Sequence, residues 1–152
     1  MNTHDEVITD LGHALLAQQL TELECVQNGA NWGESAYFLR IDIDGPLDPQ
    51  HLQRALDECV KRQPVLATEL RSVPGYHGLR QFPGAGRLDF ALTVDEQAQS
   101  AQLIEQRLTQ WYARPLQLAT GRFAEALLQR RDAQAWQLVL DVGKFLVDQE
   151  SL

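Results

Sequence analysis

Alternation of apolar and polar residues near the C-terminus is the strongest constraint on how this chain can fold. Every second residue from position 136 to 142 is apolar: Trp136, Leu138, Leu140 and Val142. The positions between them hold Gln137, Val139 and Asp141. Because successive side chains of a β-strand point to opposite faces, the four apolar residues share one face. The pattern predicts a strand over 135–142 with one face on an apolar core.

Shorter patterns predict the other elements. Strand-like segments are expected over 38–43, 89–94 and 122–129, and a hairpin over 66–72 and 79–82. Helices are expected over 10–27, 49–62 and 95–113, beginning at Asp10, Asp48 and Asp95. Their core-facing residues are expected to be Leu11, Leu15, Leu16, Leu23 and Val26; then Leu52, Ala55, Leu56, Cys59 and Val60; then Ala101, Ile104, Leu108 and Trp111. These elements predict an α/β fold with a mixed β-sheet and packed helices.

Composition limits the class of protein. The chain has 152 residues with 44% hydrophobic content, which is enough for one domain with a packed core. A net charge of −8 disfavours nucleic acid and anionic membrane as partners. We expect neither a spanning segment nor a signal peptide, and therefore a cytoplasmic protein. Cys25 and Cys59 fall in helical patterns and are expected to be buried and reduced.

Five sequence blocks, taken together and in their order along the chain, resemble those of a known protein family. They are Y-F-L-R-I-D-I-D-G-P-L-D at 37–48, L-Q-R-A-L-D-E-C-V at 52–60, R-Q-P-V-L-A-T-E-L at 62–70, P-L-Q-L-A-T-G-R-F-A-E-A-L-L at 115–128 and L-V-L-D-V-G-K-F-L-V-D-Q-E-S-L at 138–152. From about Leu20 onward, the chain resembles the N-terminal half of the condensation domains of nonribosomal peptide synthetases. The resemblance implies a chloramphenicol acetyltransferase-like fold. It divides the chain into an extension over 1–19, which includes the start of the first helix, and a condensation-like half domain over 20–152.

The chain departs from this family at the positions that carry chemistry. Gly143 and Lys144 stand where the H-H-x-x-x-D-G motif has its two histidines, Asp148 keeps the aspartate, and Gln149 replaces the glycine. A second block, commonly R-H-E-x-L-R-T-x-F, has three further replacements: Gln63, Pro64 and Ala67. The family arginine in that block supports the motif aspartate. Arg62 and Arg71 are the candidates to replace it for Asp148.

No residue of the chain is therefore assigned a catalytic role. Histidine suits proton transfer at neutral pH, whereas a solvated lysine is protonated there and cannot accept a proton. We expect Lys144 to be a solvated surface charge. The histidines, at positions 4, 13, 51 and 77, have no metal-ligand spacing. The sequence predicts no metal and no cofactor, and no condensation by the chain on its own.

The resemblance also implies a second half, which would form the other wall of a substrate tunnel, and the sequence ends at Leu152 without it. Such a half would expose an apolar face, for which the candidate interface residues are Trp32, Tyr37, Phe38 and Phe145. The alternative is that these aromatics belong to the chain's own core or loops.

Three functions remain open at this point. The chain is a catalytically inactive binding or structural module of a peptide synthetase system, or half of an acyltransferase site completed by a second chain, or the N-terminal part of a larger synthetase. The expected partners are synthetase domains or a second copy of the chain, with a carrier protein as a further candidate. Nucleic acid and membrane are not expected.

Overall fold

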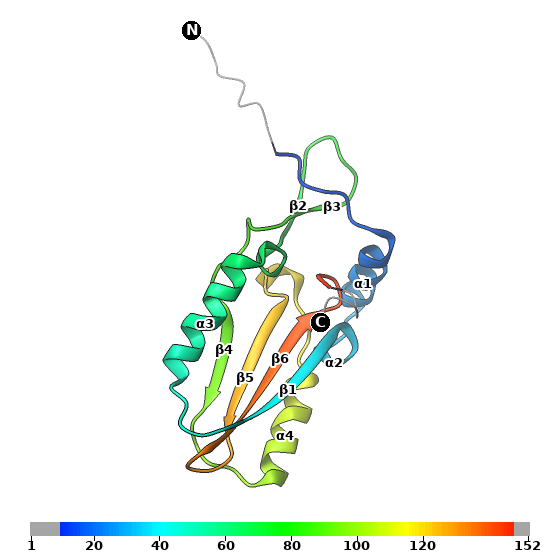
Figure 1. Cartoon of the computed structure of the whole chain (residues 1–152). Coiled ribbons are helices and arrows are strands. Elements are labelled where there is room, and N and C mark those ends of the chain that lie inside the picture. Colours follow the sequence, from blue (N-terminus) through cyan, green and yellow to red (C-terminus); the bar gives the residue numbers. More distant parts are fainter. Residues whose placement is uncertain (1–9, 148–152) are drawn as a thin grey trace.

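A computed structural model describes residues 10–147 of the chain (Figure 1). Four α-helices and two short 3-10 helices accompany six strands within this part. The helices are α1 (Ala17–Gln27), α2 (Trp32–Ser35), α3 (Pro49–Arg62), η1 (Pro64–Ala67), α4 (Ala101–Tyr112) and η2 (Leu118–Thr120). The strands are β1 (Ala36–Asp44), β2 (Glu69–Ser72), β3 (Leu79–Phe82), β4 (Ala91–Asp95), β5 (Ala124–Arg130) and β6 (Ala135–Gly143). All strands and the long helices predicted from the sequence are present.

Four of the strands form one mixed sheet in the order β1-β6-β5-β4. Strand β6 lies inside the sheet and runs antiparallel to both neighbours, whereas β4 and β5 are parallel. The β1–β6 register runs from Ala36 opposite Gly143 to Asp44 opposite Ala135. Strands β2 and β3 pair separately as an antiparallel hairpin, as predicted. The expected mixed sheet is confirmed.

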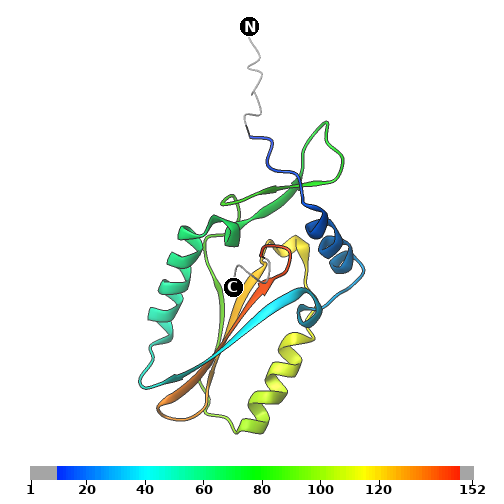
Figure 2. The ribbon, with the colours of Figure 1, turned by 45° about the vertical axis from the view of Figure 1, so that its right-hand side comes forward.

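The two faces of this sheet bury different layers. On one face, α3 packs through Leu56 and Val60 against Ala126 and Leu128 of β5 and against the alternating apolar residues of β6. On the other face, α4 contributes three buried residues that pack against Leu127 and Val139: Ile104, Leu108 and Trp111. Figure 2 shows α3 and α4 flanking the sheet on either side. The period-two pattern of β6 thus predicted its faces correctly.

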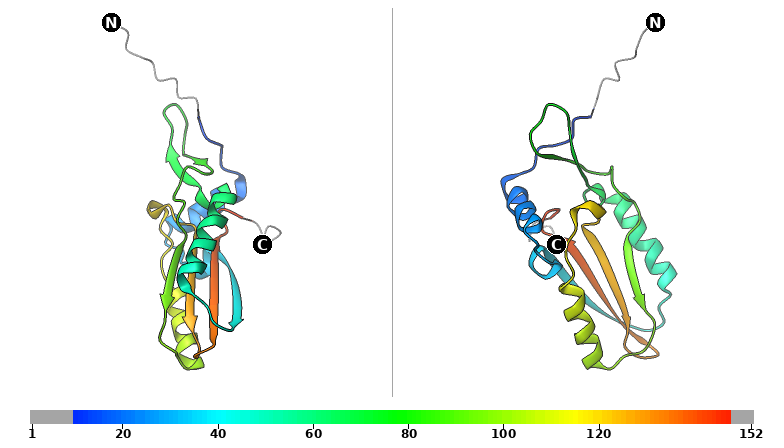
Figure 3. Two further views of the ribbon diagram at one scale, coloured as in Figure 1. Left: turned by 60° about the vertical axis from the view of Figure 1, so that its left-hand side comes forward. Right: turned by 180° about the vertical axis from the view of Figure 1, so that it is seen from behind.

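A third apolar cluster lies where β6 ends. Leu23 and Val26 of α1 pack there with Trp32, Phe123 and Phe145. The views in Figure 3 place α1 and the β2–β3 hairpin at this end of the sheet. This cluster brings the N-terminal helix against the residues that follow β6.

The start of the first helix was predicted wrongly. Asp10 does not cap a helix; its carboxylate accepts a hydrogen bond from the backbone N–H of Gly12 at 2.9 Å. The next residues run alongside β3, where His13 exchanges backbone hydrogen bonds with Gln81 at 2.8 and 2.9 Å. Tertiary pairing therefore overrides the helical pattern, and α1 begins only at Ala17. Leu11 and Leu16, expected in the core, are 40% and 69% exposed.

The third long helix also begins later than predicted. Asp95 is the last residue of β4, and its carboxylate accepts a hydrogen bond from the backbone N–H of Gln97 at 3.3 Å. Ser100 caps α4 instead, with its hydroxyl accepting from the N–H of Leu103 at 3.4 Å. Ala101 is consequently exposed rather than buried. The cap predicted at Asp48 for α3 is confirmed, because its carboxylate accepts from the N–H of Gln50 at 2.8 Å.

The burial predicted for both cysteines is wrong. Cys25 and Cys59 are free thiols, and both are exposed. On α3 the buried stripe follows the i, i+4 positions Leu52, Leu56 and Val60, so that Cys59 and Ala55 lie outside it. Among residues 10–147 no helix is long and apolar enough to cross a membrane.

The packing of α4 can be tested with one substitution at two positions of that helix. Leu108 is 2% exposed and Leu103 is 51% exposed. Leu108→Ala should lower the free energy of unfolding by about 2–5 kcal/mol, because it removes buried methyl groups and leaves a cavity. Leu103→Ala should change it by less than about 0.5 kcal/mol. Urea unfolding monitored by tryptophan fluorescence measures both, and equal effects would contradict the assignment of the buried face.

Candidate functional site: the loop that follows strand β6

The end of β6 fixes the first motif position rigidly. Gly143 is buried, and its backbone N–H donates to the carbonyl of Phe123 at 2.7 Å. Its own carbonyl accepts from the N–H of Leu146 at 2.9 Å, which closes a tight turn. A Cβ atom at this position would lie 3.3 Å from the carbonyl oxygen of Phe123. Because that oxygen belongs to the backbone, a larger residue here requires the main chain to move.

Lys144 occupies the second motif position, and its amine is hydrogen-bonded. Its backbone N–H donates to the carbonyl of Ser35 at 2.9 Å, and its Nζ donates to the carbonyl of Glu34 at 2.7 Å. The same Nζ lies 5.8 Å from the centre of the Tyr37 ring. The side chain is partly exposed, and its ammonium also ties the loop to α2 through this hydrogen bond.

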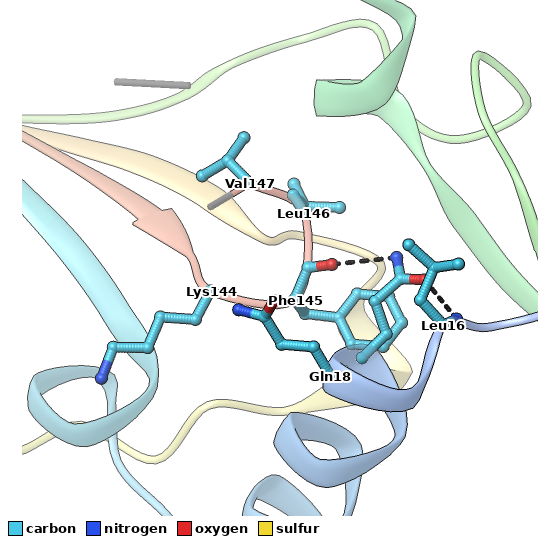
Figure 4. A pocket seen from close by; sticks show the side chains of 7 residues that line it. Leu16, Gln18, Lys144, Phe145, Leu146 and Val147 are labelled. Atoms are coloured by element: carbon cyan, nitrogen blue, oxygen red, sulfur yellow. Dashed lines mark hydrogen bonds between the residues drawn. The ribbon is translucent and has the colours of Figure 1, made fainter. Parts of the chain in front are cut away.

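The next residues turn inward. Phe145 is 4% exposed and stacks near Phe123, with 5.7 Å between the ring centres. The Phe145 carbonyl accepts a hydrogen bond from Nε2 of Gln19 on α1 at 3.1 Å. The loop and α1 enclose a cavity of about 160 Å³ lined by Leu16, Gln18, Gln19, Lys144, Phe145, Leu146 and Val147. Figure 4 shows the Lys144 side chain extending away from Leu16 and Leu146. The cavity is smaller than the roughly 300 Å³ at which ligand pockets usually begin.

The remaining motif positions and their support can be placed only in part. Asp148 and Gln149 lie outside the described residues. Of the two arginines considered as partners for Asp148, Arg62 is exposed at the end of α3. The guanidinium of Arg71 lies 3.9 Å from the centre of the Phe82 ring within the hairpin. Ala67, at the position of the family arginine, is buried in the core. That position supplies apolar packing instead of a positive charge.

The candidate interface residues divide into two groups. Trp32 and Phe145 are 3% and 4% exposed and belong to the cluster at the end of β6. They are therefore core residues of this chain, which is the alternative stated from the sequence, and they do not form an exposed surface. Tyr37 and Phe38 are half-buried on β1, and the Phe38 ring lies 4.2 Å from that of Tyr112. Aromatic composition alone did not distinguish core from surface.

A buried polar cluster next to this loop was not predicted. Asp141, two residues before Gly143 on β6, is fully buried on the α4 face. It accepts a hydrogen bond from the indole N–H of Trp111 and lies 3.7 Å from Nη2 of Arg114. Arg114 forms its shorter ion pair with Glu125, at 2.6 Å. The sequence pattern predicted one apolar face for this strand and gave no sign that Asp141, on the other face, is also buried.

The charge balance of this cluster favours a neutral Asp141. Two carboxyl groups share one guanidinium, and Glu125 has the closer contact with it. The guanidinium also stacks 3.4 Å from the centre of the Trp111 ring. Burial raises the pKa of Asp141 to about 7, and the indole hydrogen bond and Arg114 only partly oppose that rise. Oδ1 of Asp141 has no hydrogen-bond partner within residues 10–147, which adds to the cost of ionisation.

The described residues offer little for metal binding or acid–base chemistry. Between Asp10 and Val147 no group of three or more His, Cys, Asp or Glu residues could hold a metal ion. His51 is exposed and lies 3.2 Å from Asp48, and His77 is exposed in the hairpin loop. Neither residue is among those that line the cavity beside Lys144.

Comparison with solved structures identifies the fold. The starter condensation domain of rhizomide synthetase RzmA superposes with a TM-score of 0.76 at 18% identity, covering 93% of this chain and 34% of that chain. A variant of that domain in complex with C8-CoA gives a TM-score of 0.71 at 18% identity, covering 88% and 31%. The fold is that of part of a condensation domain. The X-domain from teicoplanin biosynthesis gives a TM-score of 0.77 at 16% identity, covering 95% and 30%.

These likenesses confirm the chloramphenicol acetyltransferase-like fold inferred from the sequence blocks. The chain spans about a third of the length of the condensation domains that it matches. No protein-family model and no curated protein matches the sequence.

Asp141 should give the stability of this protein a characteristic pH dependence. Its pKa is about 7 in the folded state and about 3.9 in an unfolded chain. Its contribution to stability is then fully present below about pH 4 and is lost as the pH rises through about 7. Asp141→Asn cannot ionise, so the wild-type free energy of unfolding should fall relative to this variant by up to about 4 kcal/mol over that interval.

Urea unfolding of both proteins at pH values from 4 to 9 measures this difference. Asp44→Asn removes an exposed carboxyl group from β1 and is the control for the loss of a charge. A difference between wild type and Asp141→Asn that does not change between pH 4 and pH 8 would show that Asp141 is ionised throughout.

Proposed function

We propose that this chain is a catalytically inactive condensation-like module that acts through protein contacts within a nonribosomal peptide synthetase system. The observation that carries the proposal is that neither of the residues at positions 143 and 144, where β6 ends, presents a side chain that could act as a base. Gly143 brings no side chain, and the amine of Lys144 is held by the carbonyl of Glu34. A general base must face the group whose proton it accepts, and no side chain at these two positions does so.

The cavity that the loop itself lines is small. Phe145 and Leu146 are 4% and 9% exposed, and the cavity beside them measures about 160 Å³. Acyl and aminoacyl groups carried on a pantetheine arm need a tunnel, whereas here apolar side chains pack into the cluster around Phe123. The likeness to condensation domains supports a role in a peptide synthetase system. The residues at positions 143 and 144 support the absence of catalysis.

Exposed leucines at the start of α1 support a contact surface near the same loop. Leu16 and Leu20 are 69% and 51% exposed and are four residues apart, so they lie on one side of the helix. Leu16 also lines the cavity with Phe145 and Leu146. Adjacent exposed leucines of this kind mark interaction sites. We assign this α1 surface to a synthetase domain, whose contact would bury both side chains.

Restoring the motif should not restore condensation. Gly143→His, Lys144→His and Gln149→Gly rebuild the H-H-x-x-x-D-G pattern. We expect no product above the uncatalysed rate from the purified variant with aminoacyl and acyl carrier-protein substrates, because a side chain at Gly143 crowds the backbone of Phe123 and the cavity lined by the loop measures only about 160 Å³. Mass spectrometry of the carrier-bound products measures this. Turnover by the wild-type chain itself would overturn the proposed inactivity.

Binding to purified synthetase domains tests the proposed role. The wild-type chain should retain a synthetase domain in a pull-down and in titration calorimetry. The double variant Leu16→Ser and Leu20→Ser should weaken that binding by about tenfold or more, because it removes the apolar contact. Leu103→Ser, at an equally exposed leucine on α4, is the matched control and should bind normally. Failure of the wild-type chain to bind any domain of its assembly line would overturn the proposed function.

A further inference from the structure

Strand β1 lies at one edge of the main sheet with its outer side unpaired. Within residues 10–147, β6 is the one strand that pairs with it, and the pairing extends over all of Ala36–Asp44. Figures 1 and 2 show β1 crossing the front of the sheet as its outermost strand. A long edge strand presents a row of backbone N–H and C=O groups to any strand that can align with it. Strand β1 is therefore a template for pairing with another chain.

From Leu39 to Asp44 the side chains of β1 separate by chemical type, whereas Phe38 lies on the same face as Arg40. The odd positions hold Tyr37, Leu39, Ile41 and Ile43, which share the apolar face. Leu39 is 49% exposed on that face. The charged residues of the strand, Arg40, Asp42 and Asp44, are exposed on the opposite face. A strand that aligns with β1 must match an apolar row and a charged row at once.

We infer that the occupant of this edge is β1 of a second copy of the chain, in an antiparallel pair centred on Ile41. A twofold axis through Ile41 brings Arg40 opposite Asp42 of the second copy, and this pair occurs twice by symmetry. On the apolar face, Leu39 comes opposite Ile43 of the second copy, and Ile41 meets its own symmetry mate. Cross-strand pairs of these types stabilise antiparallel sheets. The two sheets would join into one continuous sheet.

Neighbouring registers of the antiparallel pair are less favourable because they place like charges opposite each other. Only registers centred on a residue keep both apolar rows on the same face. Centring on Arg40 would place the two copies of this guanidinium directly opposite each other. Centring on Asp42 would do the same for two carboxylates. The register centred on Ile41 forms two opposite-charge pairs and no like-charge pair.

The existing contacts of the charged residues are compatible with this arrangement. Arg40 pairs with Glu105 at 2.7 Å, and Asp42 pairs with Arg131 at 3.2 Å, all through side chains that are 44% exposed or more. Exposed ion pairs of this kind are weak and can be extended by a further partner. The second copy would add one opposite charge to each pair.

This inference rests on the proposed function, since it specifies a second protein contact of the same non-catalytic module. It uses a different surface from the one assigned to the synthetase domain. The leucines of that surface are Leu16, which caps α1, and Leu20 within α1, whereas self-association uses β1. The two can therefore fail independently.

A charge exchange between two variants tests the register. The wild-type chain should sediment as a dimer at about 100 µM and dissociate on dilution. Arg40→Asp alone creates two Asp–Asp pairs, and Asp42→Arg alone creates two Arg–Arg pairs. Each variant should weaken dimerisation by about tenfold or more. An equimolar mixture of the two should restore it, because each position 40 then faces an opposite charge at position 42.

A cross-link gives a second, geometric measurement. In a background with Cys25→Ser and Cys59→Ser, Ile41→Cys should form a disulfide-linked dimer under mild oxidation. Directly opposite residues of an antiparallel pair have Cα atoms about 4.5–5.5 Å apart, which suits a disulfide. Leu39→Cys is the matched control, since its symmetry mate would lie about 13 Å away along the strand. Circular dichroism verifies that all variants are folded.

The outcomes separate the two proposals. A wild-type monomer at 100 µM, or a dimer that neither charge variant weakens, would overturn the β1 pairing. A monomer that still binds a synthetase domain through Leu16 and Leu20 would overturn only the pairing and leave the proposed function standing. Loss of synthetase-domain binding in both charge variants, with no dimer of the wild type, would assign the β1 edge to a hetero-partner and overturn self-association.

Discussion

Strand β6 is hydrogen-bonded along both of its sides, to β1 and to β5, over nearly its whole length. An interior strand has no free backbone groups, and its side chains must satisfy two packed faces at once. One face of β6 packs in the apolar cluster that includes α3, and the other face packs against α4. The rest of the domain is arranged around this strand. The position of the loop at 143–147 follows directly from where β6 ends.

The buried polar cluster shows how this arrangement tolerates a carboxyl group in the core. Asp141 lies among the indole of Trp111, the guanidinium of Arg114 and the carboxylate of Glu125. These groups connect β5, β6 and the end of α4. A neutral Asp141 lowers the cost of burying two acids with one base. Condensation chemistry is not needed to explain this cluster, since each contact has a structural role.

The loop after β6 combines apolar packing with hydrogen bonds to neighbouring elements. The apolar residues Phe145 and Leu146 still fill the cluster that joins α1 to the sheet. The two positions that carry histidines in the family instead provide a tight backbone turn and an ammonium bound to α2. The apolar residues of the loop are thus held by packing, and its polar positions are held by hydrogen bonds within the chain.

The sequence by itself determined the strands, the central helices and the family of the fold. The period-two pattern of 135–142 and the stripe at Leu52, Leu56 and Val60 depend only on local geometry, so both survived in the structure. The block order sufficed for the condensation-like fold even though the overall identity to the solved domains is 16–18%. The absence of histidines at Gly143 and Lys144 was likewise readable directly from the sequence.

Only the tertiary structure decided where the first helix begins and which residues are buried. Pairing of His13 with Gln81 overrides the helical pattern before Ala17, because a strand neighbour far along the chain supplies the backbone hydrogen bonds. Burial of Trp32 and Phe145 depends on α1 folding over the end of β6. The cluster around Asp141 joins residues up to 30 positions apart. Such contacts arise when distant elements pack, and no local pattern in the sequence encodes them.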